Sequence, residues 1–116
     1  MEKNKTIADL SFEFALSIIE LYKIFLKNNE YVLSKQLLRS ATSIGANVEE
    51  AQAGQTKKDF TTKMAIASKE ARETRYWLRL LEKSDLVKAD FTMYLKNIEV
   101  IIRILTKIVK TAQSNP

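Results

Sequence analysis

The acidic residues of this 116-residue chain are the first side chains to consider for chemistry. Glu49, Glu50, Glu70 and Glu73 fall on two neighbouring helical segments and would approach one another if those segments form a hairpin. Carboxylates in a helical bundle can hold two iron ions, but such sites also use Glu-x-x-His pairs, and the chain has no His. Acid and base catalysis by paired carboxylates needs a cleft, which a tightly packed bundle does not supply. We therefore expect no catalytic residue, no metal and no cofactor.

Basic side chains gather on one face of the segment 57–83. Placed at 100° per residue, they fall within an arc of about 120°. The candidates for binding nucleic acid are Lys58, Lys69, Arg72, Arg75, Arg79 and Lys83, and Lys57 lies in the same arc. Such an arc could follow a row of phosphates, with affinity that falls steeply as salt rises. The same arc is also typical of a solvated helix face that has no ligand, and both interpretations stay open.

A second stripe runs along the segment 36–50 and is polar and mostly small. Its members, Gln36, Ser40, Ser43, Asn47 and Glu50, recur at helical spacing beside an apolar seam that runs from Leu37 to Ala51. Solvated helix faces carry long Lys and Glu side chains instead. This stripe therefore predicts close contact with another helix. The candidates for helix–helix or subunit contact are Arg39, Ser40, Ser43, Asn47, Glu50, Glu70, Glu73 and Trp77.

Four helices are needed to position these residues. The apolar periodicity predicts them at about 6–28, 33–53, 57–83 and 88–112, with Thr56 as the N-terminal cap of the third. Heptad spacing is regular from Phe60 to Leu81 and from Phe91 to Ala112. Because the connections are short, we expect an all-α fold, an antiparallel up-down-up-down four-helix bundle, as one domain over 1–116.

Composition narrows the class of protein. The chain has no Cys and no His, only two Gly and one Pro, and a net charge of +5. The charge is uneven, because residues 57–116 carry 13 basic and 7 acidic side chains, which favours an anionic partner. The N-terminal stretch has no uncharged run long enough for a signal peptide or a membrane span. We expect a cytoplasmic protein with no membrane partner.

More apolar residues are present than one core needs. Phe12, Ile19, Ile66 and Trp77 lie beside the main seams, and Trp is enriched where proteins contact one another. Wide stripes that flank a single core account for some of these residues. The remainder favour a surface that binds protein.

The segment from Gln36 to Ala51 resembles the signature of the bacterial four helix bundle protein family, also called 23S rRNA intervening-sequence or S23 proteins. The resemblance continues through Asp59-Phe60, Lys69-Glu70-Ala71 and Tyr76-Trp77-Leu78. The chain departs from the pattern at Ala51, where the family often has Gly. The outer helices match only as apolar patterns.

The resemblance implies a four-helix monomer that forms a homo-oligomer, usually a pentamer. It also implies a relation to the basic accessory protein of diversity-generating retroelements, which is thought to bind nucleic acid. Arg39, Ser43, Asn47 and Glu50 match the signature and would lie at helix or subunit contacts. Two functions remain open: an oligomer that binds structured RNA or DNA through the basic arc, and a structural or adaptor protein that binds another protein. Neither is an enzyme.

Overall fold

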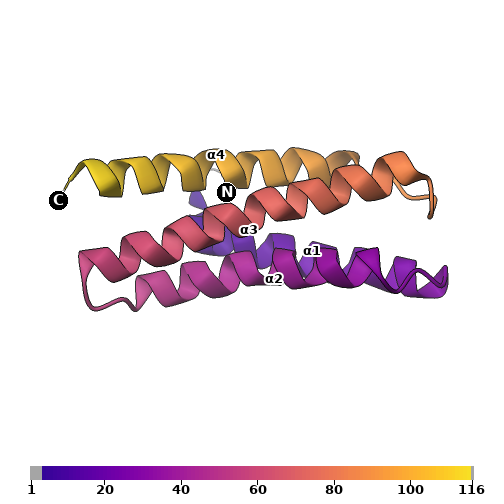
Figure 1. The fold of residues 1–116 in the computed structure, drawn as a ribbon, viewed down its shortest axis with the longest axis horizontal. Helices are drawn as coiled ribbons and strands as arrows, with labels where there is room; N and C mark the ends of the chain where they lie inside the picture. Colours follow the sequence, from indigo (N-terminus) through magenta and orange to yellow (C-terminus); the bar gives the residue numbers. More distant parts are fainter. Residues whose placement is uncertain (1–3, 116) are drawn as a thin grey trace.

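The computed structural model describes residues 4–115, which form an antiparallel all-α four-helix bundle. The helices are α1 (Ile7–Lys27), α2 (Leu33–Gln52), α3 (Lys57–Ser84) and α4 (Thr92–Ser114). Figure 1 shows that they run alternately in opposite directions along the long axis. Among the described residues each helix packs on its two neighbours around the bundle, and α2 and α3 share the most extensive interface. The predicted fold class is confirmed.

Local hydrogen bonds explain where the helices begin. Thr6 and Asp9 form a reciprocal capping box at α1. The predicted cap of α3 is present, because the Thr56 hydroxyl accepts from the Asp59 amide at 3.0 Å. At α2 the Glu30 carboxylate accepts from the amides of Leu33 and Ser34, at 2.8 and 2.9 Å. These acceptors satisfy amides that have no partner inside the helix.

The predicted start of the fourth helix was wrong. Residue 88 lies in the connection, and α4 begins at Thr92, where the Asp90 carboxylate accepts from the Thr92 amide at 3.0 Å. The chain turns at Asp85, which has a positive φ of 58°. It then inserts Val87 into the core before Asp90 restarts helical hydrogen bonding. The apolar residues of this connection have the spacing of a helix although they are not helical, and this spacing led to the early predicted start.

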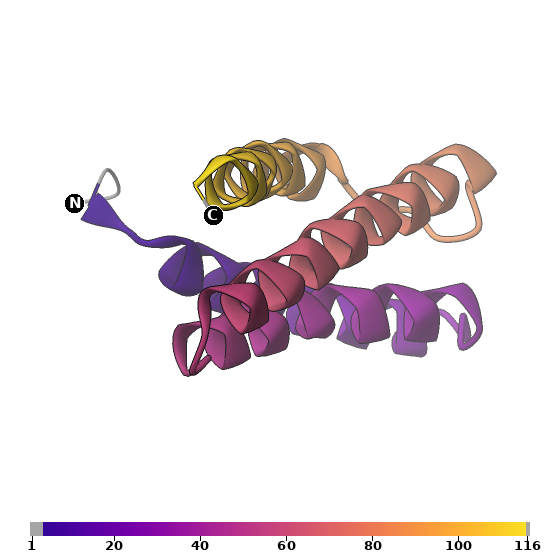
Figure 2. The same cartoon turned by 60° about the vertical axis from the view of Figure 1, so that its left-hand side comes forward.

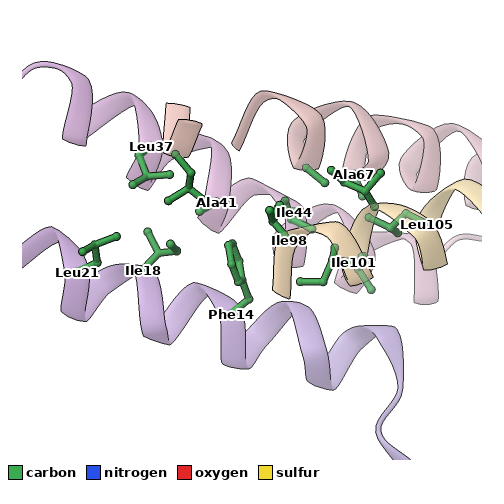
Figure 3. Packing of buried hydrophobic residues seen from close by; sticks show 14 of the residues in the cluster. Phe14, Ile18, Leu21, Leu37, Ala41, Ile44, Ala67, Ile98, Ile101 and Leu105 are labelled. Atoms are coloured by element: carbon green, nitrogen blue, oxygen red, sulfur yellow. The ribbon is translucent and has the colours of Figure 1, made fainter. Parts of the chain in front are cut away.

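The core is formed by the predicted heptad seams. In Figure 3, Phe14, Ile18 and Leu21 of α1 point toward Leu37, Ala41 and Ile44 of α2, with Ile98 of α4 beside Ile44 and Leu105 of α4 farther along the bundle. All eight are buried, and removing a large apolar side chain of this kind from water stabilises a fold by about 1.5–3 kcal/mol. Small residues on α2 and α3, including Ala41, Ala67 and Ala71, allow these two helices to pack closely.

The arrangement leaves a broad outer surface on α3 and α4. Figure 2 shows α3 running obliquely between the α1–α2 pair and α4, which is viewed almost end-on. One side of α3 therefore faces α2, another faces α4, and a third faces outward. The candidate residues on α3 divide among these three sides.

Candidate nucleic-acid interface

The basic arc predicted on α3 is largely exposed. Lys58, Lys69, Arg72, Arg79 and Lys83 are exposed, and Arg75 is half-buried. Two of these arginines reach the neighbouring helix. Arg72 donates to the Thr106 hydroxyl of α4 at 2.9 Å, and Arg75 pairs with Glu99 of α4 at 3.0 Å. The arc therefore adjoins α4 directly.

A second basic line lies on α4 and was not predicted. Lys96, Arg103, Lys107 and Lys110 are all exposed. They are spaced by seven, four and three residues, which places them on one side of a helix. The spacing of these four residues is visible in the sequence. Whether they extend the α3 arc depends on which helix lies beside α4 and in which register, and the sequence does not give this.

The contacts between Arg72 and Thr106 and between Arg75 and Glu99 fix that register. The two helices are antiparallel, so the same register brings Lys69 toward the level of Lys110 and Arg79 toward the level of Lys96. The two lines thus form one surface, here called the basic face. It comprises Lys58, Lys69, Arg72, Arg79 and Lys83 of α3 with Lys96, Arg103, Lys107 and Lys110 of α4.

A shallow groove of about 590 Å³ runs along this surface on α4. It is lined by Arg103, Lys107 and Lys110, by Thr106 and Thr111, and by Glu99. Glu99 is paired with Arg75, whereas within residues 4–115 the three basic residues lie in no ion pair. The groove therefore presents uncompensated positive charge.

An exposed aromatic ring stands within the basic arc of α3. Tyr76 is 56% exposed, and its ring meets that of Trp77 edge to face, with 5.1 Å between centroids. By helical position it lies on the same side as Lys69 and Lys83. Exposed aromatic rings among basic side chains are surfaces on which bases stack. The sequence-based site did not include Tyr76.

The opposite side of α3 carries an ion-pair cluster with α2. Arg39 pairs with Glu73, and it also lies 3.4 Å from Glu70. The Trp77 indole N–H donates to the Glu73 carboxylate at 2.9 Å. This hydrogen bond, with that from Arg39, lowers the pKa of Glu73 against the opposing effect of burial. The bond to Glu73 likewise raises the pKa of Arg39.

The small polar stripe of α2 contacts α3 of the same chain through two of its members, Ser40 and Glu50. Ser40 is fully buried, and its hydroxyl lies 2.9 Å from that of Thr74. Glu50 pairs with Lys63 of α3 at 2.7 Å. Asn47 donates instead within its own helix, to the carbonyl and hydroxyl of Ser43 at 2.9 and 3.1 Å. The structure therefore places Ser40 and Glu50, like Arg39, at a helix–helix contact.

These glutamates do not form a metal site. Glu70 and Glu73 lie against Arg39, Glu50 is paired with Lys63, and Glu49 is exposed on α2, so no three of the four carboxylates come together. Over residues 4–115 no group of three or more acidic residues could hold a metal ion. Within the same range, no helix is long and apolar enough to cross a bilayer.

Comparison with known proteins identifies the family. The family model described as 23S rRNA-intervening sequence protein matches residues 3–107. Among solved structures, the chain is similar to a protein of unknown function from the S23 ribosomal protein family of Bacteroides thetaiotaomicron. The two share 42% sequence identity with a TM-score of 0.86, over 90% of this chain and 99% of the other. No curated protein gives a significant match. The chain therefore belongs to the 23S rRNA-intervening sequence protein family.

Proposed function

We propose that this protein binds structured RNA or duplex DNA through the basic face of α3 and α4, as a homo-oligomer that catalyses no reaction. The observation that carries the proposal is the register of the two basic lines. Arg72 reaches Thr106 at 2.9 Å, so the α3 arc and the α4 line merge into one positive surface. The α3 arc alone, or the basic line of α4 alone, would present fewer positive charges to one ligand.

The chemistry of the face suits phosphates more than base edges. From Lys69 to Lys83 the α3 arc extends about 21 Å at 1.5 Å per residue. That length matches about six base pairs of duplex at 3.4 Å each. Exposed lysine and arginine side chains can each neutralise a phosphate, and about five such contacts would give a log–log salt slope near −4.5. We therefore expect binding that depends on shape and charge, with little sequence preference.

Assembly would strengthen such binding. A single face of this size is expected to bind weakly, whereas several copies held together bind one polyanion with higher avidity. The resemblance to the family supports a homo-oligomer. A binding function is favoured over a catalytic one, because Glu50, Glu70 and Glu73 are paired with basic residues and the chain has no His or Cys.

The test is fluorescence anisotropy with labelled 20-base-pair RNA and DNA duplexes at 50 and 200 mM salt. Arg103→Glu and Lys110→Glu should each weaken binding about tenfold and flatten the salt slope by about one unit. Lys35→Glu is the matched control, because Lys35 is exposed on α2, away from the basic face, and the charge change is equal. It should change affinity less than twofold.

The alternative is a structural or adaptor protein whose partner is another protein. The exposed apolar side chains of α1, led by Phe12 at 65% and Leu16 at 50%, favour this second function. Affinity weaker than tens of micromolar at 50 mM salt, or binding without a salt slope, would exclude the nucleic-acid proposal and leave the adaptor function.

A further inference from the structure

At one end of the bundle α1 does not reach as far as α3 and α4 (Figure 1). Leu10 and Phe14 of α1 border the same small pocket as Val100 and Ile101 of α4, so the first turns of α1 lie at that level of α4. Because the two helices are antiparallel, Ile7 at the start of α1 lies near the level of residue 107, and α4 beyond that level has no part of α1 beside it. Figure 1 shows α3 and α4 extending past the first turn of α1.

An apolar groove of about 500 Å³ occupies that uncovered end. Its floor is Phe60 of α3 with Ile104, Ile108 and Ala112 of α4. Lys57 and Lys107 stand at its rim with Thr111 and Asn115, and no acidic side chain lines it. From residue 104 to 115 the groove extends about 16 Å along α4. That length and composition fit one face of an amphipathic helix with acidic flanks.

The chain itself carries such a face. Phe12, Leu16 and Ile19 are 65%, 50% and 37% exposed and lie on the side of α1 opposite the buried Phe14, Ile18 and Leu21. Their spacing of four and three residues is the spacing by which a helix fills a groove. Asp9, Glu13 and Glu20 run along one flank of this stripe. Here it is called the outer face of α1.

We propose that the outer face of α1 in one copy of the chain packs into the α3–α4 groove of the next copy. Phe12, Leu16 and Ile19 would cover Phe60, Ile104 and Ile108, and the acidic flank would lie against Lys57 at the rim. Glu13 and Glu20 are paired with Lys5 and Lys23 in the single chain, at 2.7 and 2.9 Å. Surface pairs of this kind are weak and can be exchanged on binding.

The contact is head to tail, because the two surfaces are different parts of the molecule. Each copy would offer one groove and one outer face, which closes into a ring when the rotation permits. This inference rests on the homo-oligomer of the proposed function and names the surfaces that build it. An acidic amphipathic helix of another protein is the alternative occupant.

The test is the solution mass of the full chain by sedimentation velocity. The wild type should be larger than one chain, and Leu16→Glu and Ile108→Glu should each reduce the mass to that of a monomer. Met93→Glu is the matched control, because Met93 is an exposed apolar residue near the far end of α4 and should leave the mass unchanged. Far-ultraviolet circular dichroism checks that each variant is folded. If Ile108→Glu does not fold, Lys57→Glu at the rim replaces it and should weaken self-association.

Mixing the two variants gives the sharpest result. The Leu16→Glu copy keeps an intact groove and the Ile108→Glu copy keeps an intact outer face, so the mixture should form dimers of one copy of each. A monomeric wild type would overturn both the homo-oligomer and this interface. A wild-type oligomer whose mass survives both substitutions would overturn the interface alone. Monomeric variants that fail to form the mixed dimer would also contradict the head-to-tail contact.

Discussion

Arg75 of α3 donates through one guanidinium nitrogen to both carboxylate oxygens of Glu99 on α4, at 3.0 and 3.2 Å. Arg75 was one of the predicted phosphate contacts, but in the folded chain its charge is compensated within the bundle. With the hydrogen bond from Arg72 to Thr106, this pair aligns two basic helices side by side. The residue therefore contributes to the basic face by setting the register rather than by offering a free charge.

Glu99→Gln should strengthen binding to duplex nucleic acid. The substitution removes the one acidic side chain that lines the α4 groove and releases Arg75 for a phosphate. We expect a log–log salt slope steeper by about one unit, measured by anisotropy against wild type. Because Glu99 is 49% exposed, the free energy of unfolding should change by less than about 1 kcal/mol. An unchanged slope would show that Arg75 does not reach the ligand.

Ser40→Leu should destabilise the chain by about 2 kcal/mol or more, because Ser40 is fully buried against Thr74 where α2 and α3 approach closely. Urea unfolding at pH 7 measures the change. Gln36→Leu is the control, since Gln36 belongs to the same stripe but is exposed and should be nearly neutral. Equal effects at the two positions would contradict a packing role specific to Ser40.

Much of the fold follows from periodicity alone. The seam from Phe60 to Leu81 and the Thr56 cap are local signals, and the structure has both. The pairing of Arg75 with Glu99 and the merging of the two basic lines depend on register between separate helices, which no single helix encodes. The connection before α4 misled the prediction because Val87 and Phe91 are buried without being helical. Tyr76 was missed because one aromatic residue gives no periodic pattern.

Glu30→Gln should destabilise α2 by about 1 kcal/mol at pH 7. Burial acts to raise the pKa of Glu30, but hydrogen bonds from the Ser34 and Leu33 amides outweigh it and lower the pKa overall. A lowered pKa means that this stabilisation is fully present above the unfolded value of about 4.3 and is lost as pH falls through the folded value. Urea unfolding should therefore show a difference in the free energy of unfolding between wild type and variant that is smaller at pH 3 than at pH 7. Glu49→Gln is the matched control, because Glu49 is exposed on α2, and it should change the free energy of unfolding little at pH 7.

The fluorescence of Trp77 should report the titration of Glu73. Trp77 is the only tryptophan of the chain, and its indole N–H donates to the Glu73 carboxylate. Because this bond and that from Arg39 lower the pKa of Glu73, the acid transition in emission should have its midpoint below about pH 4.3. Arg39→Gln should move the midpoint upward, whereas Lys35→Gln should not. A midpoint unaffected by Arg39→Gln would mean that Arg39 does not stabilise the charged form.

Tyr76→Ala should separate single-stranded from duplex binding. Tyr76 is exposed between basic residues of α3, so an unpaired base can stack on its ring, whereas the paired bases of a duplex are already stacked. Stacking of this kind is worth about 1–3 kcal/mol per base, or about 5- to 150-fold in affinity. Anisotropy with a hairpin RNA bearing an unpaired loop should show that loss, and a blunt duplex should show almost none. Tyr76→Phe keeps the ring and should bind as wild type, and Tyr31→Ala removes an equally exposed ring from the α1–α2 connection as a control. An equal loss of affinity for hairpin and duplex would mean that Tyr76 supports the structure of α3. Loss of a stacking contact would lower the affinity only for a ligand that has an unpaired base.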